Sequence, residues 1–329
     1  MPITRDQVAL NAIQWINLPP EPGQPQVWLY NEPSWRAEQP GVHRKIREAG
    51  FDAVMIEVLD TQTLQNYERM LREAQLRPAP GYVQVTLPEL HGLDIRPGSA
   101  EWVRWFDQVR RRAEETNYLG LDSVFIAAEV AYDQPRFHKA VAQGIEFDQD
   151  RLERHVEVFA EAATVLKAEG VRAGLHNHVG TWIETEHEIE YVLANIDASL
   201  LGASLDIGHL AWAGIDYVDF LRRHRDRLLD LHIKDLDLEV ARQTREHDTS
   251  YTDASNRRLF LEPGLGQIDF AGVFAAIGDD FPGWLIIEVD RATMEPFESA
   301  KFSWEWVTRT IPAEGLRSLH QLHGSAHRG

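Results

Sequence analysis

Metal-type ligands stand at the ends of four apolar runs in the C-terminal half of the chain, and this arrangement limits the fold more than any other feature. Three runs end at His176, Asp206 and His232, and a later one ends at Glu288. Each run has the length and composition of a buried strand. Because the carboxyl ends of parallel strands meet at one face of a barrel, we expect the four side chains to converge at its mouth.

Apolar runs of strand length alternate with longer stretches of helical periodicity along the chain. The expected strands cover residues 10–16, 51–58, 77–85, 123–129, 171–175, 201–205, 228–233 and 284–289. The expected helices cover residues 41–48, 62–75, 99–116, 148–169, 217–226, 270–277 and 299–308, with one more from Thr185, where Glu188 completes a capping box. Eight such alternations predict an α/β fold, a single closed (β/α)8 TIM barrel. An open doubly wound sheet is the alternative, but no glycine-rich phosphate fingerprint follows the first strand.

No linker composition divides the chain, so we expect one domain over residues 1–329. Residues 18–40 form a loop rich in Pro, Gln and Trp that is long enough to be functional. A polar insert is expected at about residues 237–261. The tail, about residues 312–329, is expected to be loosely held.

The chain is acidic, with 52 Asp and Glu against 33 Lys and Arg. This balance argues against nucleic acid or an anionic membrane as a partner, since both reward a basic surface. The absence of cysteine excludes disulfides and thiolate metal sites, and with no signal peptide or apolar span evident we expect a cytoplasmic protein. The sequence leaves the oligomeric state open, a homo-oligomer included.

Two imidazoles and two carboxylates suit a divalent ion. We take His176, Asp206, His232 and Glu288 as the ligand candidates. Mn²⁺ is the default for mixed nitrogen and oxygen ligation, with Co²⁺, Mg²⁺, Zn²⁺ and Fe²⁺ as alternatives.

These segments resemble the sugar isomerase/epimerase superfamily with a xylose-isomerase-like barrel, and within it the inosose dehydratase family. The resemblance rests on four motifs: HNHVGT at residues 176–181, DIGH at 206–209, HIKD at 232–235 and PGLGQID at 263–269. It covers about residues 169–308 and is weaker in the N-terminal half. It implies a metal-dependent lyase of carbohydrate metabolism and inositol catabolism, with Asp206, His232 and Glu288 as ligands.

The resemblance leaves the ligand on the fifth strand less secure. Ketose 3-epimerases of this superfamily carry a glutamate there, which pairs with the last-strand glutamate to move protons on both faces of the substrate. This chain has His176 at that position. A ligating imidazole cannot also be a free base, so the substitution favours an elimination over an epimerisation. His178 is an alternative ligand in place of His176.

The catalytic candidates are His178, Lys234 and Glu288. An unligated His178 suits a general base, because an imidazole titrates near working pH. Lys234 is expected to reach substrate oxygens, with a salt bridge as its alternative role, and Asp235 to orient His232.

Further residues are candidates for substrate binding or for the rim of the barrel. His209, Glu57 and Trp15 are the substrate-binding candidates, with packing or support roles as alternatives. Glu57 and Glu129 also end strands at the mouth, as acid/base partners or rim salt bridges. Weaker candidates are the tryptophans at 35, 182 and 212 and the arginines at 242, 245, 257 and 258.

The leading hypothesis is a dehydratase that acts on a keto-polyol or keto-sugar through an enediolate. The metal would polarise a ketone, a base would remove the α-proton, and a β-hydroxyl would leave as water. The alternatives are a ketose isomerase or epimerase, a lyase of 3-keto-glycosides, and a non-catalytic binding protein on a barrel scaffold.

Overall fold

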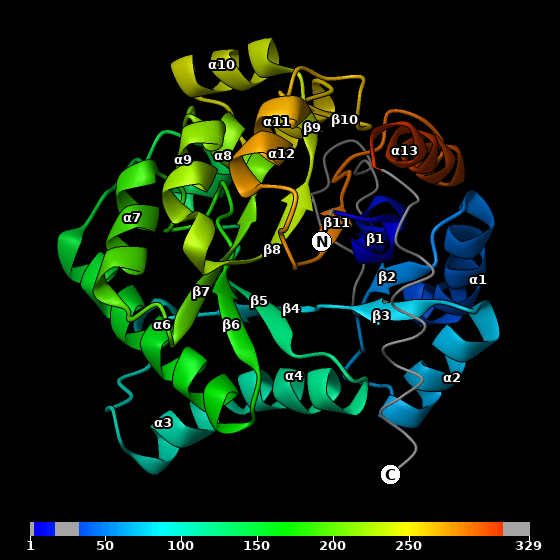
Figure 1. Ribbon diagram of the computed structural model, residues 1–329. Helices are drawn as coiled ribbons and strands as arrows, with labels where there is room; N and C mark the ends of the chain where they lie inside the picture. The colour runs from blue at the N-terminus through cyan, green and yellow to red at the C-terminus, as the bar shows by residue number, and fades with distance from the viewer. Residues whose placement is uncertain (1–2, 17–32, 312–329) are drawn as a thin grey trace.

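A computed structural model describes residues 3–16 and 33–311 of the chain (Figure 1). Its main sheet has nine strands in the order β3-β2-β1-β11-β8-β7-β6-β5-β4, and every pairing between them is parallel. The strands are β1 Val8–Leu10, β2 Ala53–Met55, β3 Arg77–Ala79, β4 Tyr82–Val85, β5 Ser123–Ala128, β6 Arg172–Leu175, β7 Leu201–Asp206, β8 Leu228–Ile233 and β11 Leu285–Ile287. The structure confirms the predicted α/β barrel.

The two end strands of this sheet, β3 and β4, are consecutive in the chain and separated only by Pro80 and Gly81. They are the two halves of one stave, since β3 pairs with β2 and β4 pairs with β5. This stave therefore closes the ring and reduces nine strands to eight staves. The predicted strand at residues 77–85 is confirmed, with the break at the prolines that interrupt it.

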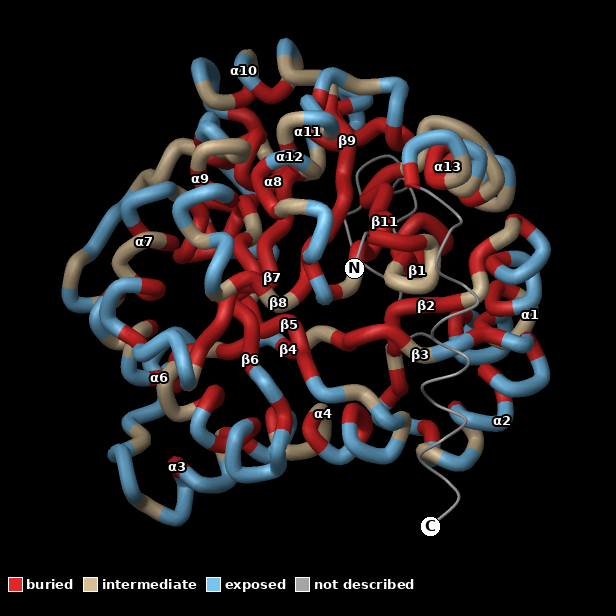
Figure 2. The backbone as a smooth tube through the Cα atoms, in the orientation of Figure 1, coloured by how far each residue is buried: buried red, intermediate tan, exposed pale blue. Residues whose placement is uncertain are grey.

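Helices surround the barrel and pack against its outer face (Figure 1). They are α1 Pro33–Ala49, α2 Leu64–Ala74, α3 Ala100–Trp105, α4 Asp107–Tyr118, α5 Pro135–His138, α6 Gln149–Ala168, α7 Glu186–Asn195, α8 Ile207–Trp212, α9 Tyr217–His224, α10 Leu238–Glu246, α11 Tyr251–Asn256, α12 Phe270–Ile277 and α13 Pro296–Thr310. Figure 2 shows buried backbone along the staves and exposed backbone on the outward sides of the helices. None of the helices within the described ranges has the length and apolarity to span a bilayer.

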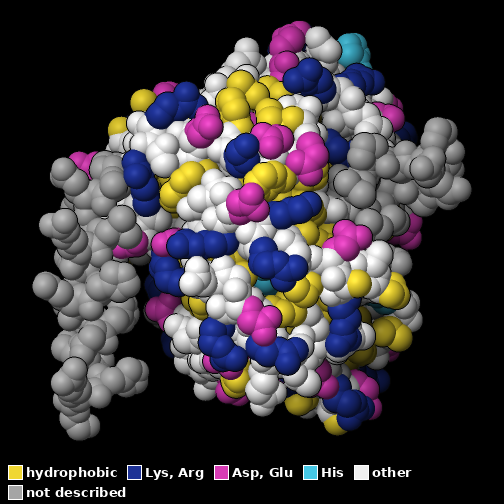
Figure 3. Space-filling model, turned by 90° about the vertical axis from the view of Figure 1, so that its right-hand side faces the viewer, with side chains coloured by type: hydrophobic (Ala, Val, Ile, Leu, Met, Phe, Trp, Pro, Cys, Tyr) yellow, Lys and Arg dark blue, Asp and Glu magenta, His cyan; other side chains and the backbone are white. Residues whose placement is uncertain are grey.

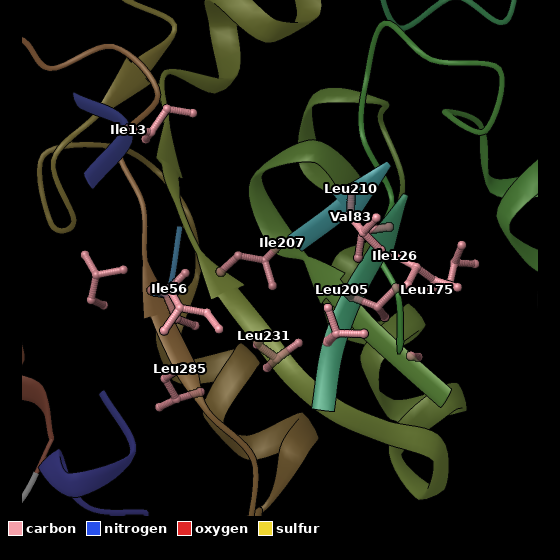
Figure 4. Close-up of a cluster of buried hydrophobic side chains, with 14 of the residues drawn as sticks. Ile13, Ile56, Val83, Ile126, Leu175, Leu205, Ile207, Leu210, Leu231 and Leu285 are labelled. Carbon is pink, nitrogen blue, oxygen red and sulfur yellow. The ribbon is translucent and has the colours of Figure 1, made fainter. Parts of the chain in front are cut away.

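The core lies in two layers, because alternate residues of a strand point to opposite faces. Inside the barrel, Ala9, Ala53, Met55, Ala79, Phe125 and Ile286 form a small cluster of short or slender side chains. Between the barrel and the helices lies the larger cluster, which includes Leu205, Leu231 and Leu285 from adjacent staves (Figure 4). Leu231 is in register with both other leucines. The residues next to these leucines therefore face the barrel interior, and this places Asp206 and His232 inside.

The predicted first strand, residues 10–16, was wrong in its bounds. The strand is Val8–Leu10, and residues 12–15 form a 3-10 helix (η2, Ala12–Trp15) that Asn11 caps. The side chain of Asn11 accepts a hydrogen bond from the backbone N–H of Ile13 at 3.0 Å. Asparagine offers the backbone such a local partner, which ends a strand and starts a turn. The apolar run 10–16 hid this stop.

The predicted loop at residues 18–40 was also wrong where the structure describes it, whereas the predicted helix at 41–48 is confirmed with an earlier start. Helix α1 begins at Pro33 and contains Pro40, whereas residues 17–32 lie outside the described ranges. Buried Trp35, Gln39, Val42 and Ile46 repeat at helical spacing across the proline. Burial of this face outweighs the one backbone hydrogen bond that Pro40 cannot donate. The predicted helix at 99–116 is two helices, α3 and α4, which meet at Phe106.

The segment predicted as a polar insert, residues 237–261, contains α10, α11 and the short strand β10 (Phe260–Leu261). β10 pairs antiparallel with β9 (Asp235–Leu236), just beyond the mouth end of β8. Tyr251 of α11 is fully buried, so the segment is partly core. The tail at 312–329 lies outside the described residues.

On the face of the molecule drawn in Figure 3, basic and acidic side chains are interspersed.

The capping box at the start of α7 gives a stability test. The hydroxyl of Thr185 accepts the N–H of Glu188 at 3.4 Å, and the Glu188 carboxylate accepts the N–H of Thr185 at 2.9 Å. We expect Thr185→Ala to lower the free energy of unfolding by about 1 kcal/mol, measured by urea denaturation. Thr164→Ala, at an exposed position within α6, is the control and should change it by less than about 0.5 kcal/mol. Equal stability of the two variants would contradict the capping role.

Candidate metal centre and active site

Three of the four predicted ligands converge at the carboxyl ends of adjacent staves. His176 follows β6, Asp206 is the last residue of β7, and His232 lies in β8. One donor atom from each lies within 4.8 Å of the others, and all three side chains are buried. Asp206 and His232 are direct partners in the ladder between β7 and β8. The barrel register thus brings these ligand types to one point.

A hydrogen bond fixes the ring orientation of His176. Its Nδ1 lies 3.2 Å from the carbonyl oxygen of Ser204. A carbonyl only accepts, so Nδ1 carries the proton and Nε2 keeps its lone pair for a metal ion. Gly174 makes room for this neighbouring stave, because a Cβ there would lie 1.9 Å from Ser204 Oγ.

The residue between the two histidines of the HNH motif ties β6 to β7. Asn177 donates from Nδ2 to the carbonyl of Asp206 at 3.1 Å and accepts the N–H of Asp206 at 3.0 Å. The side chain of Asp206 in turn caps α8 by accepting the N–H of His209 at 3.0 Å. This paired amide contact fixes the position of one ligand relative to the other.

Glu288 lies beside this group of three without being part of it. Its Oε2 is 2.9 Å from His232 Nδ1 and accepts a hydrogen bond from Asn11 Nδ2 at 2.7 Å. Its Oε1 is 3.0 Å from Lys234 Nζ. Burial raises the pKa of Glu288, but the positive charges of Lys234 and His232 outweigh it and hold that pKa well below its usual range. Glu288 is therefore ionised and fully engaged.

Lys234 is buried under the centre and surrounded by carboxylates. Its Nζ lies 2.9 Å from Asp206 Oδ2, 3.0 Å from Glu288 Oε1 and 2.9 Å from Asp290 Oδ2. Burial lowers the pKa of Lys234, but these negative charges outweigh it and raise that pKa well above its usual value. Gly208 allows the close approach of α8, because a Cβ there would lie 2.8 Å from Lys234 Cβ.

His178 presents one nitrogen that is available as a base. Its Nδ1 donates to the carbonyl of Val179 at 2.7 Å, so Nε2 is the unprotonated nitrogen. Its ring packs on His209 at 3.9 Å between centroids and stacks on Tyr251 at 5.8 Å. Burial and then the charge of Lys234 lower the pKa of His178 to about 4, so the ring is neutral near pH 7. His209 is buried, and its Nε2 lies 3.2 Å from Lys234 Nζ.

A cavity of about 380 Å³ opens onto this cluster. The metal end of its wall carries Asn11, His176, His178, His232 and Glu288. The remaining wall carries Tyr82 and Gln84 of β4 together with the polar side chains His43, Glu57, Tyr67, Gln108 and Arg112. A site of this size accommodates a small polyhydroxylated molecule.

Of the three predicted substrate-binding residues, one lines this cavity and two do not. Glu57 lines it, whereas Trp15 does not, although its neighbours Ala12 and Ile13 do. His209 lies behind His178 and Lys234 and is also absent from the wall. The tryptophans at 35, 182 and 212 are buried in packing contacts outside the lining.

Two further candidates are held in contacts outside the cavity. The Glu129 carboxylate is bonded to the Thr86 hydroxyl and lies 2.8 Å from His91 Nε2. Arg242 is bonded to the carboxylates of Glu239 and Glu246 on its own helix. Glu129 therefore takes the salt-bridge role that was its alternative, and Arg242 forms exposed salt bridges within its own helix.

Asp235 does not orient His232, as its position in the HIKD motif had suggested. Its carboxylate accepts the backbone N–H groups of Gly264, Gly266 and Ile268 at 2.8, 2.9 and 3.1 Å. The PGLGQID motif is therefore a loop folded around this carboxylate. A Cβ on Gly266 would lie 2.2 Å from Asp235 Oδ1, which explains the glycine.

Several residues of the site were missed at the sequence level. Asn11 was hidden by the error in the first strand. Asp290 was passed over as a late strand residue, yet it contacts Lys234 and accepts a hydrogen bond from Tyr251 at 3.0 Å. Gln84 and Arg112 had no local signal, because only the closed barrel brings β4 and α4 to the cavity.

The donor atoms fit a divalent ion. Both ring nitrogens of His232 and Asp206 Oδ2 are buried, yet none makes a hydrogen bond of acceptable geometry within the described residues. His232 Nδ1 is nonetheless 2.9 Å from Glu288 Oε2, and Asp206 Oδ2 is 2.9 Å from Lys234 Nζ, so these atoms have close charged neighbours without well-aligned hydrogen bonds. Burial lowers the pKa of His232, but the charges of Glu288 and Asp206 raise it to about 9. Such a site holds a cation, and mixed nitrogen and oxygen donors suit a transition metal.

Fold and site together define a class: barrel proteins with a divalent metal site at the carboxyl ends of their strands. A family model for xylose isomerase-like TIM barrels matches residues 44–310, and the chain belongs to this family.

Among curated proteins, an inosose dehydratase of Geobacillus thermodenitrificans is 34% identical over 144 residues, which is 43% of this chain and 48% of that protein. The rhizopine catabolism protein MocC of Rhizobium meliloti is 32% identical over 151 residues, 45% of this chain and 46% of that protein. The chain thus spans about half the length of the curated relatives that it matches.

Solved structures share the fold at lower identity. The IolI protein with a bound zinc atom superposes with a TM-score of 0.61 at 14% identity, covering 93% of this chain and 98% of that one. A D-allulose 3-epimerase of Methylomonas sp. in complex with D-allulose gives 0.63 at 17%, covering 94% and 98%. A probable 3-DHS dehydratase, AsbF of Bacillus anthracis, gives 0.61 at 14%, covering 92% and 98%.

The contact between Asn177 and Asp206 gives a testable prediction for metal binding. We expect Asn177→Ala to weaken the binding of Mn²⁺ or Zn²⁺ by about 10- to 100-fold, because Asp206 loses the support that orients it. Isothermal titration calorimetry of metal-stripped protein measures this change, and His232→Ala should abolish binding. Asn195→Ala, which removes an exposed amide bonded to Tyr191, should leave the affinity unchanged. An Asn177→Ala affinity equal to that of Asn195→Ala would contradict the clamp.

Proposed function

We propose that this protein is a metal-dependent dehydratase that acts on a keto-polyol or keto-sugar of the inosose type. The observation that carries the proposal is the pairing of a metal-type cluster with one unprotonated imidazole nitrogen, that of His178, on the wall of one small cavity. The names of the curated relatives, inosose dehydratases, support the same substrate class.

The metal would be held by His176, Asp206, His232 and Glu288, with Mn²⁺ as the default ion. Glu288 is included as the fourth ligand because its Oε2 lies 2.9 Å from Nδ1 of His232. When bound, the ion supplies Lewis-acid polarisation of the substrate ketone. The zinc atom bound in the IolI structure supports a divalent ion of this kind.

The side chains near the ion would have separate roles in the reaction. Nε2 of His178 takes the proton from the carbon next to the ketone, and His209 and Tyr251 hold the ring against rotation by stacking on it. Lys234 keeps Asp206 and Glu288 ionised from behind. A direct role of Lys234 on substrate oxygens requires its Nζ to leave these carboxylates, because the residue is fully buried and does not line the cavity.

Elimination fits this arrangement better than epimerisation. Epimerisation moves protons on both faces of one carbon and needs a second free base. Glu288 is the carboxylate nearest to that role, but Asn11, Lys234 and His232 occupy its oxygens. A dehydration needs only one base for the proton on carbon, because its second proton transfer goes to the departing oxygen.

A ketose isomerase or epimerase is the second candidate. It is favoured by the likeness in fold to the allulose 3-epimerase, whose structure contains D-allulose. The same cluster and cavity would serve it, provided that the proton returns to a different position of the substrate.

Product analysis separates the two candidates. Purified protein with Mn²⁺ should convert scyllo-inosose into a dehydrated diketone whose enol absorbs in the ultraviolet, whereas a panel of ketoses in D₂O should show no exchange of carbon-bound hydrogen. Exchange into a ketose without loss of water would replace the dehydratase with the isomerase. Inactivity on both, with metal bound, would contradict both.

Replacement of the proposed base gives the next prediction. We expect His178→Ala to retain metal, measured by titration calorimetry, and to lower the rate of dehydration by about 10²-fold or more, as for loss of a general base. His187→Ala, which removes an exposed imidazole of α7, is the matched control and should keep full activity. Loss of metal from His178→Ala would instead identify His178 as the ligand of β6.

A further inference from the structure

Glu57 stands at the end of the cavity wall that the metal cluster does not occupy. It follows β2 and lines the same cavity as His178 and His232. The proposed base and ligands account for the removal of one proton, yet dehydration also requires that the departing hydroxyl gain one. Asp60 is the other carboxyl-bearing side chain that lines this cavity away from the metal cluster, and it is exposed to solvent.

The backbone of Glu57 is fixed from three sides. Its N–H donates to the hydroxyl of Tyr67 at 2.9 Å, and its carbonyl accepts from Gln39 Nε2 at 2.9 Å. Gln62 binds Gln39 at 2.7 Å and accepts the N–H of Leu59 at 2.9 Å. This network holds the end of β2 against α1 and α2, so the backbone position from which the Glu57 side chain extends is fixed by the fold.

The side chain itself is left available. Its Oε1 is buried and has no hydrogen-bond partner within the described residues. The nearby cation, Arg112, is already bound to the carboxylate of Glu115 and donates to the carbonyl of Val58 at 3.1 Å. A buried oxygen that makes no well-aligned hydrogen bond, beside the indole of Trp35 and on the wall of a substrate-sized cavity, is suited to a substrate hydroxyl.

The environment of Glu57 also favours its protonated form. Burial raises the pKa of this carboxyl well above its usual value, and the charge of Arg112 and the nearby indole of Trp35 oppose the shift without cancelling it. A carboxyl whose pKa is raised in this way holds its proton more strongly, and it is the protonated form that a general acid requires.

We propose that Glu57 is the general acid that protonates the leaving hydroxyl. This inference rests on the proposed dehydratase function and assigns its second proton transfer. His178 takes the α-proton, and the electron pair of that C–H bond forms the carbon–carbon double bond. The C–O bond to the β-carbon breaks, and the departing oxygen takes the proton of Glu57 and leaves as water. Exchange with solvent returns a proton to Glu57 and removes one from His178, so the net change is loss of one water.

The test compares two substrates and three variants under Mn²⁺. Glu57→Gln should lower the dehydration of scyllo-inosose by about 10²-fold or more, while deuterium exchange at the α-carbon continues. An inosose analogue with fluorine in place of the β-hydroxyl needs no acid, because fluoride leaves as an anion, and Glu57→Gln should eliminate it at nearly the wild-type rate. His178→Ala should lose dehydration, deuterium exchange and fluoride elimination. Glu129→Gln, which changes a carboxyl outside the cavity, should retain all three.

The outcomes separate failure of this assignment from failure of the function. Undiminished dehydration by Glu57→Gln, or equal loss with hydroxyl and fluoride, would overturn the role of Glu57 while the dehydratase stands. Loss of the acid step in Tyr82→Phe with Glu57→Gln unaffected would transfer the role to Tyr82, which lines the same cavity. A wild-type protein that exchanges the α-proton but never releases water or fluoride would overturn both proposals.

Discussion

The site depends on negative charge buried at the mouth of the barrel. Asp206, Glu288 and Asp290 lie together in a region closed to water, and carboxylates in such a place require a cation. Lys234 supplies one positive charge from behind, within 3.0 Å of each. The imidazoles of His176 and His232 lie beside these carboxylates, and both ring nitrogens of His232 lack a hydrogen bond of acceptable geometry within the described residues. A divalent ion completes the balance, and the acidity of the site therefore accounts for both the buried lysine and the affinity for metal.

Closure of the barrel forms a cavity beside this charge cluster. The cluster comes from β6, β7, β8 and the end of β11, whereas Glu57 and Gln84 come from the opposite arc, β2 and β4. Strands β1 and β5 join these arcs, and a cavity remains between them. Its two walls differ chemically, since one holds metal-type side chains and the imidazole of His178 and the other holds Glu57, a carboxyl whose pKa burial raises. A reaction that takes a proton from one carbon and gives one to an oxygen on the next needs such opposed walls.

Support around the reacting groups comes from contacts distant in sequence. Asn177 joins the ends of β6 and β7, Asn11 reaches Glu288 across 277 positions, and Tyr251 of the segment between β9 and β10 binds Asp290. The segment at residues 237–261 is thus part of the site, since its buried tyrosine stacks on His178. These groups set the orientation of the ligand candidates and of the proposed base.

The sequence by itself determined the barrel and the identity of the metal-type residues, because strand length, helical periodicity and the residue at each strand end are local properties. It also located the capping box at Thr185 and the break in the third stave. It failed at Asn11 and Pro40, where a long apolar run and a proline outweighed weaker signals nearby. Only the tertiary structure decided which side chains line the cavity, that Lys234 faces three carboxylates, that Asp235 organises a loop, and that burial raises the pKa of Glu57. Each of these depends on burial and on partners tens to hundreds of positions away, and no local pattern of residues encodes such a distance.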